Sequence, residues 1–170
     1  MRAQIFFRFL ICVCAKVKMI LTEKQKSIVK DLQDQEKLCI QKYEQGEQQA
    51  RDPELKQLFC SIKEDEQEHY NSLSQLLNGT CPIVDTNDNS GKNYSPTATY
   101  FGTFNQEDKE FDQYLCTDSI ASEKYVSSVY NNDLFQFAEP EVRRLFNHIQ
   151  TEEQNHAEMI YKYKTVNNMQ

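Results

Sequence analysis

Glu66-Gln67-Glu68-His69 recurs later in the chain as Glu153-Gln154-Asn155-His156, so the pattern Glu-x-x-His occurs twice. Residues three positions apart lie on the same face of an α-helix, and the carboxylate and imidazole of each copy can therefore reach one point in space. Such a pair forms half of a metal site, which becomes complete when other helices supply more carboxylates. The pattern predicts that both stretches are helical and face a shared centre.

Two upstream glutamates supply the missing carboxylates. Glu36 lies 30 residues before Glu66, and Glu123 lies 30 residues before Glu153, so a shift of 87 relates the two sets. The same shift relates eight further identical pairs: Asp31 and Asp118, Lys37 and Lys124, Tyr43 and Tyr130, Pro53 and Pro140, Glu54 and Glu141, Leu58 and Leu145, Phe59 and Phe146, and Ile62 and Ile149. One helical hairpin is thus used twice. The chain has only three histidines, and two of them complete the pattern.

Di-iron and di-manganese carboxylate bundles have a characteristic ligand set. Two helices supply one Glu each, and the other two supply one Glu-x-x-His motif each. Two cations about 3.5–4 Å apart repel each other, and bridging carboxylates offset that repulsion. We expect Glu66 and Glu153 to bridge, Glu36 and Glu123 to be terminal ligands, and each histidine to bind one metal. The predicted metal ligands are Glu36, Glu66, His69, Glu123, Glu153 and His156. Iron or manganese suits these donors, and zinc could also occupy the site.

A polar seam wetted by solvent, with the histidines capping the carboxylates, is the alternative to a metal site. Four buried anions without cations would cost several kcal/mol each, as an order of magnitude, or would be protonated. Tyr43 and Tyr130 follow Glu36 and Glu123 by two helical turns. One interpretation is that both are core residues with one hydrogen bond each. The alternative is that they support the metal ligands or are themselves redox-active.

Composition narrows the class of protein. The chain has 170 residues, which suffice for one domain with a full core, and only four Gly and four Pro, too few for a β-sandwich or barrel. A net charge of −7 argues against a nucleic-acid partner. No C-x-x-C pair occurs among the six cysteines, so zinc ribbons and rubredoxin-like sites are excluded. We expect reduced thiols in an intracellular protein, with intermolecular cross-linking in an assembly as the alternative.

Residues 1–18 differ from the rest of the chain. Their apolar run from Phe9 to Ala15 is too short for a membrane span, and Arg8 splits the apolar region. We interpret residues 1–18 as a tail or a mis-called extension, with Met19 as the true start, and a cleaved signal peptide as the alternative.

The predicted fold is an all-α, ferritin-like four-helix bundle, in a single domain over residues 19–170. Thr22 with Gln25 forms a capping box, and Asp52-Pro53 starts the second helix. We assign a hairpin to 22–79, a crossover to 80–104 and a second hairpin to 105–167. A crossover this long lets the third helix run parallel to the second.

Apolar stripes define the buried face of each helix, and polar groups interrupt them. For the first helix the predicted stripe includes Ile28, Leu32, Glu36 and Cys39. His148 lies off the stripe of the fourth helix, so we expect it at the surface. Four aromatic residues are expected to pack the crossover onto the bundle: Tyr94, Tyr100, Phe101 and Phe104.

The first hairpin resembles the spore coat protein F family in Gln35-Glu36-Lys37-Leu38, Tyr43, Ala50-Arg51-Asp52-Pro53-Glu54-Leu55 and Glu66-Gln67-Glu68-His69. The second hairpin, over 118–160, resembles it too, and these motifs also occur in ferritin-like and rubrerythrin-like proteins. The resemblance implies a component of the bacterial endospore coat, synthesised in the cytoplasm, with other coat proteins or further copies of itself as partners and no nucleic acid or membrane span.

Two functions therefore remain open. The first is a structural coat protein whose two iron or manganese ions hold the bundle together. The second is a di-iron oxidase or peroxidase that resembles rubrerythrin without its rubredoxin domain. The sequence assigns no catalytic residue that would separate them.

Overall fold

The computed structural model describes residues 19–85, 89–101 and 105–169. These residues form five α-helices and one short 3-10 helix, without a β-strand: α1 (Glu23–Gln49), α2 (Pro53–Leu77), α3 (Ser90–Asn93), α4 (Gln106–Asp133), η1 (Leu134–Gln136) and α5 (Pro140–Val166). The predicted all-α class is confirmed. The predictions for residues 1–18 and for Phe104 fall outside the described residues.

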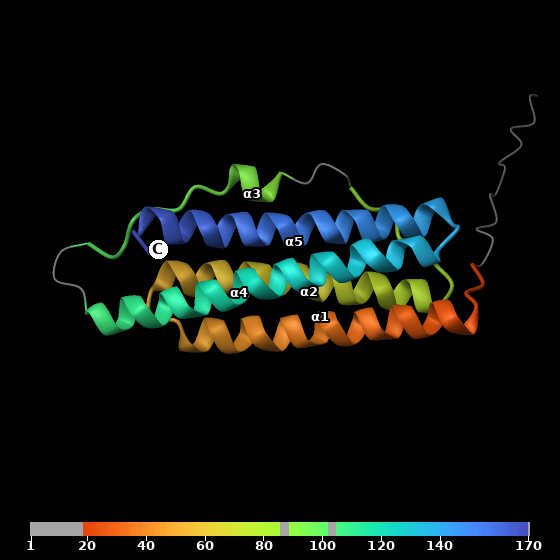
Figure 1. Cartoon of the computed structure of the whole chain (residues 1–170), viewed down its shortest axis with the longest axis horizontal. Helices are drawn as coiled ribbons and strands as arrows, with labels where there is room; N and C mark the ends of the chain where they lie inside the picture. Colours follow the sequence, from red (N-terminus) through yellow and green to blue (C-terminus); the bar gives the residue numbers. More distant parts are fainter. Residues whose placement is uncertain (1–18, 86–88, 102–104, 170) are drawn as a thin grey trace, which may run out of the picture.

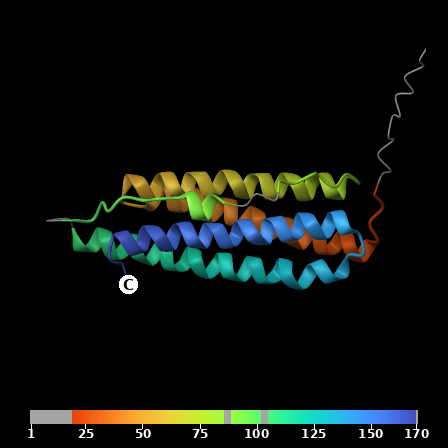
Figure 2. The same cartoon turned by 90° about the horizontal axis from the view of Figure 1, so that it is seen from above.

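The four long helices lie side by side with their axes nearly aligned (Figures 1 and 2). Helices α1 and α2 form one antiparallel hairpin, and α4 and α5 form the other. Between them the chain returns along α5, against which the short helix α3 packs, so that α4 runs in the same direction as α2 (Figure 1). This direction is the one predicted from the long crossover.

Local capping explains where the helices begin. Thr22 and Gln25 form the predicted capping box at α1. Asp52 accepts a hydrogen bond from the Glu54 backbone N–H at 3.0 Å, and Pro53 occupies the first turn of α2. Glu139, at the equivalent position before α5, makes no such side-chain bond. The two hairpins therefore share their ligands more closely than their caps.

Two apolar clusters form the core, one toward each end of the bundle. The first includes Leu32, Leu73 and Phe146, and the second includes Phe59 and Tyr163. Burying a large apolar side chain stabilises the fold by roughly 1.5–3 kcal/mol. The interrupting Glu and His side chains predicted from the sequence lie on the helices between these clusters, so apolar packing on both sides excludes water from them.

Several surface details differ from the predictions. Phe101 is 69% exposed, whereas Tyr100 is buried as expected and Tyr94 is half-buried. The buried stripe of α1 begins at Val29, which is fully buried, whereas the predicted first member, Ile28, is half-buried. His148 is not a surface residue, because its side chain is only 15% exposed and its Nε2 lies 3.1 Å from Glu152. Helices α3 and η1 were not predicted.

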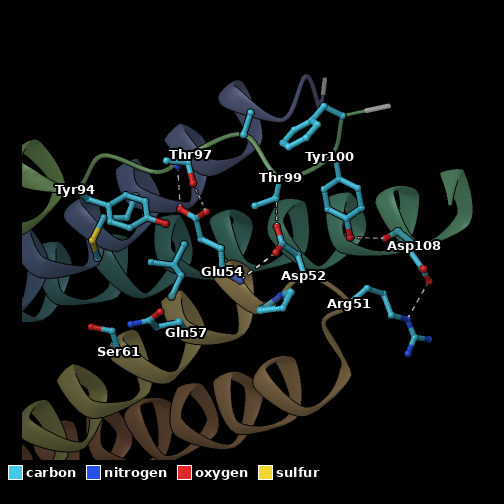
Figure 3. A pocket seen from close by; sticks show the side chains of 15 residues that line it. Arg51, Asp52, Glu54, Gln57, Ser61, Tyr94, Thr97, Thr99, Tyr100 and Asp108 are labelled. Atoms are coloured by element: carbon cyan, nitrogen blue, oxygen red, sulfur yellow. Dashed lines mark hydrogen bonds and ion pairs between the residues drawn. The ribbon is translucent and has the colours of Figure 1, made fainter. Parts of the chain in front are cut away.

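Polar side chains hold the crossover onto the start of α2 (Figure 3). Thr97 donates its backbone N–H and its hydroxyl to Glu54, at 3.0 and 2.9 Å. Thr99 donates its hydroxyl to Asp52, which also accepts from the Tyr163 hydroxyl at 2.6 Å. The crossover is therefore anchored by hydrogen bonds as well as by its aromatic residues.

Asp112 on α4 is a second acceptor of three hydrogen bonds in this region. Its fully buried carboxylate accepts from the backbone N–H groups of Arg51 and Asp52 at 2.8 and 2.9 Å, and from the Tyr100 hydroxyl at 2.6 Å. We expect Asp112→Ala to lower the free energy of unfolding by about 3 kcal/mol, because three donors, two of them in buried hydrogen bonds, lose their acceptor. Chemical denaturation followed by circular dichroism measures this change.

Asp118→Ala on the same helix is the control for Asp112→Ala. The Asp118 side chain is 54% exposed and pairs with Lys42 at 2.7 Å. Its loss should cost no more than about 1 kcal/mol. Equal losses for the two variants would contradict an anchoring role for Asp112.

The described residues contain no helix with both the length and the apolar character of a membrane span. Their four cysteines are free thiols, with Cys39 and Cys116 buried and Cys60 and Cys81 partly buried.

Candidate metal centre

All six predicted ligands meet in the middle of the bundle. Each is at most 3% exposed, and the four long helices supply them: Glu36 from α1, Glu66 and His69 from α2, Glu123 from α4, and Glu153 and His156 from α5. They form two groups whose donor atoms lie within 4.8 Å of one another: Glu36, Glu66, His69 and Glu153, and Glu66, Glu123, Glu153 and His156. Glu66 and Glu153 belong to both groups, as bridging carboxylates would.

Each histidine points its Nδ1 atom at three carboxylates from three helices. His69 Nδ1 lies 3.3 Å from Glu66, 3.3 Å from Glu153 and 3.6 Å from Glu36. His156 Nδ1 lies 3.5 Å from Glu66, 3.6 Å from Glu123 and 3.9 Å from Glu153. The two halves of the centre therefore repeat each other, as the 87-residue shift requires.

Buried atoms without hydrogen-bond partners concentrate at this point. Among the described residues they include one oxygen each of Glu36, Glu66 and Glu123, both oxygens of Glu153, and Nδ1 of His156. A buried acceptor without a partner is costly, and a carboxylate without a counter-charge costs more. Oxygen and imidazole donors that face each other in groups of four fit a divalent cation in each group.

Burial and the neighbouring charged groups together set the protonation of this cluster. It raises the pKa of Glu36 to about 7, although His69 partly offsets this. Burial and the neighbouring carboxylates also raise the pKa of Glu153 well above its usual range. Burial would likewise raise the pKa of Glu66, but the two imidazoles outweigh it and hold that pKa low.

In both histidines, as in Glu66, the neighbouring charged groups outweigh the effect of burial on the pKa. Burial alone would lower the pKa values of His69 and His156, but the carboxylates around them outweigh it and raise both. Protons are thus retained on these buried groups, and any cation bound here would have to displace them.

Two further acids, the outer acids Asp65 and Glu152, contact the Nε2 atoms of the histidines, on the side of each ring that faces away from the six predicted ligands. His69 Nε2 lies 2.8 Å from a Glu152 oxygen, and His156 Nε2 lies 3.4 Å from an Asp65 oxygen. Asp65 and Glu152 are related by the 87-residue shift, and each contacts the histidine of the opposite helix. A carboxylate at the second ring nitrogen fixes the orientation of a ligating imidazole. Sequence reasoning missed these two residues, although an acid directly before each Glu-x-x-His was visible.

Tyr43 and Tyr130 cross between the two hairpins. Tyr43 donates its hydroxyl to Glu123, and Tyr130 donates its hydroxyl to Glu36. Both tyrosines are at most 1% exposed, and burial raises the pKa of each well above its usual range. The hydroxyls therefore stay protonated and fix the two carboxylates predicted to be terminal ligands.

The outer acids give a direct test of the histidine geometry. We expect Asp65→Asn and Glu152→Gln each to weaken metal binding by about 10–100-fold, because the imidazole loses its orienting partner. Metal titration against a competing chelator measures the affinity. Glu68→Gln, an exposed acid of α2, is the control and should leave the affinity unchanged. Equal affinities for all three variants and the parent would contradict an orienting role.

Three hollows on the surface of the described residues differ in whether ligands of the centre line them. The first, of about 840 Å³, lies at the crossover (Figure 3), and Glu54 on its wall is about 18 Å along α2 from Glu66. The second, of about 670 Å³ between α1 and α4, has Cys39 and Val126 among its lining residues and none of the six ligands. The third, of about 350 Å³ between α4 and α5, is lined by Glu123 and Glu153.

Comparison with known proteins gives one family match. Residues 112–167 match the family model of the Coat F domain, and this range spans most of α4 and all of α5. None of the curated proteins or solved structures compared with the chain matches it. The second hairpin is therefore similar to the Coat F domain, and the matched range contains Glu123, Glu153 and His156.

Proposed function

We propose that this chain is a ferritin-like bundle that binds two divalent cations, iron or manganese, at its centre. One observation carries the proposal: six buried side chains form two overlapping groups of metal donors, with five carboxylate oxygens left unpaired. Glu36 and His69 would hold one cation, Glu123 and His156 the other, and Glu66 and Glu153 both. The bound cations would neutralise the four carboxylates and tie the two hairpins together.

We assign this bundle to the coat of the bacterial endospore as a structural component. The match of residues 112–167 to the Coat F domain and the resemblance of both hairpins to spore coat protein F support this assignment. Its partners would be other coat proteins or further copies of the chain. In this role the metals contribute stability, and no turnover is required of them.

A di-iron oxidase or peroxidase is the second candidate. The specific observation in its favour is that two ligands of the centre, Glu123 and Glu153, are among the residues that line the α4–α5 hollow, which would give small reactants a short path to the centre. A bound iron pair would supply one-electron redox chemistry toward oxygen or hydrogen peroxide. Tyr43 and Tyr130 would hold the terminal carboxylates in place during that chemistry.

Metal analysis of the chain tests the shared part of both candidates. After anaerobic purification and loading with ferrous iron, we expect two metal ions per chain. Fewer than one per chain, with the fold intact by circular dichroism, would overturn the metal centre. Oxidation of the loaded iron by oxygen or peroxide over repeated turnovers would favour the enzyme.

Fractionation of mature spores tests the cellular role. An antibody against the chain should detect it in the coat fraction and not in the core fraction. Detection in the core alone would overturn the coat assignment while leaving the metal centre standing.

A further inference from the structure

We propose that the α4–α5 hollow is the route by which divalent cations enter the centre. This inference rests on the proposed metal-binding function and adds a path to it. Of the three hollows described, this one has ligands of the centre in its wall: Glu123 from α4 and Glu153 from α5. Because both side chains are at most 1% exposed, a cation in the hollow would reach their oxygens through a movement of these side chains, without any helix having to move apart.

The inner end of the hollow carries carboxyl oxygens without hydrogen-bond partners. Both Glu153 oxygens and Glu123 Oε2 are buried and have no hydrogen-bond partner among the described residues. Glu153 is also the ligand that both donor groups share, so an entering cation would reach the shared position first. From Glu153 the cation could pass to either donor group, because this carboxylate belongs to both.

The walls are small and rich in oxygen. Ser127 donates its hydroxyl to the backbone carbonyl of Gln150 at 3.3 Å, and Gln154 donates its amide to the same carbonyl at 2.9 Å. Hydroxyl and amide oxygens are suitable transient partners for a hydrated divalent cation. Lys124 also lines the hollow, but it is exposed and its ammonium group can extend into solvent.

The repeat supplies an internal comparison. At the positions equivalent to Ser127 and Ala157, the first hairpin carries Ile40 and Tyr70, which are both half-buried. The ligands are identical in the two hairpins, yet the residues beside them change from bulky to small. Ligand geometry alone does not require this change, because the first hairpin holds its Glu and His with the bulky pair. The small pair therefore marks the second hairpin as the side of entry.

Filling the hollow tests the route. We expect Ala157→Tyr, alone or with Ser127→Ile, to slow the binding of Co²⁺ to the metal-free chain by at least about tenfold in stopped-flow absorbance. The final stoichiometry should stay at two ions per chain, since no ligand is changed. Ala121→Tyr is the matched control, because Ala121 lines the α1–α4 hollow instead. It should leave the rate unchanged.

The outcomes distinguish a failure of the proposed metal-binding function from a failure of the entry route alone. A parent chain that binds no Co²⁺ overturns the proposed function itself. A parent chain that binds two ions, at a rate that Ala157→Tyr leaves unchanged, overturns only the route. Slowing by Ala121→Tyr alone would place the entry between α1 and α4 and also overturn it. If circular dichroism shows that Ala157→Tyr does not fold, Ser127→Val replaces it, with a slowing of severalfold expected and an unchanged rate counting against the route.

Discussion

Replacing Glu66 and Glu153 together by alanine should abolish metal binding by the chain. These two carboxylates belong to both donor groups, so their loss leaves each cation with a single Glu and a single His. Two protein ligands are too few to hold iron or manganese against water, since both metals favour several oxygen donors. Metal analysis after anaerobic loading and desalting should fall from two ions per chain to none.

The isosteric variant Glu153→Gln tests whether Glu153 acts as a metal ligand or as a purely structural residue. Glu153→Gln should lower the unfolding free energy of the metal-loaded chain and leave that of the metal-free chain unchanged or higher. The reason is that Glu153 is fully buried with both oxygens unpaired, so without a cation its carboxylate opposes folding. Glu68→Gln removes one exposed acid from α2 and should change neither form.

The opposite result would support the solvent-wetted polar seam. In that case Glu153→Gln would destabilise the metal-free chain by several kcal/mol, as an order of magnitude for breaking a buried polar network. Added metal would then leave the melting temperatures of the parent chain and of the variant unchanged. Thermal unfolding of both proteins with and without manganese distinguishes the two cases.

The features that the sequence predicted correctly depend on short spacings. Glu-x-x-His places its two side chains on one helical face whatever the rest of the chain does. The capping box at Thr22 and the Asp52-Pro53 start of α2 are also local, and the structure has both. The 87-residue repeat then extended one hairpin to two, which brought Glu36 and Glu123 into the predicted centre.

The features that the sequence did not predict depend on how separate helices meet. Asp65 and Glu152 look like ordinary charged residues until α2 and α5 are paired, because each contacts the histidine of the other helix. Asp112 likewise gains two donors only when the first turns of α4 meet the α1–α2 turn, and it gains the third from Tyr100 of the crossover. Exposure of Phe101 also could not be predicted, since an aromatic residue in a loop has no periodic pattern to place it.

Metal should stabilise the chain more at about pH 8 than at about pH 5, because protons and cations compete for the same ligands. Burial raises the pKa of Glu36 to about 7 in the folded chain, from an unfolded value near 4.5. Its contribution to stability is therefore complete below that unfolded value and is lost as the pH rises through about 7. The raised pKa values of Glu153, His69 and His156 act in the same direction.

The effect of Glu66 on stability has the opposite pH dependence to that of Glu36, and it falls in a more acidic pH range. Its folded pKa lies below the ordinary 4.5, so its contribution is present above that value and is lost only in more acidic solution. Between about pH 5 and pH 8 the metal-free chain should therefore become less stable as the pH rises. Bound cations would offset this loss, since they would neutralise the carboxylates that have lost their protons.

Thermal unfolding with and without manganese at the two pH values measures the effect. At a free metal concentration 100 times the dissociation constant, each site contributes about 2.7 kcal/mol, so two sites contribute about 5 kcal/mol. For a chain of this size that corresponds to a rise in melting temperature of roughly 10–20 °C at the higher pH. The Glu66→Ala, Glu153→Ala double variant is the control and should show no rise at either pH. A larger rise at about pH 5 than at about pH 8 would contradict the competition, because it would mean that the metal binds without displacing protons from these buried carboxyls.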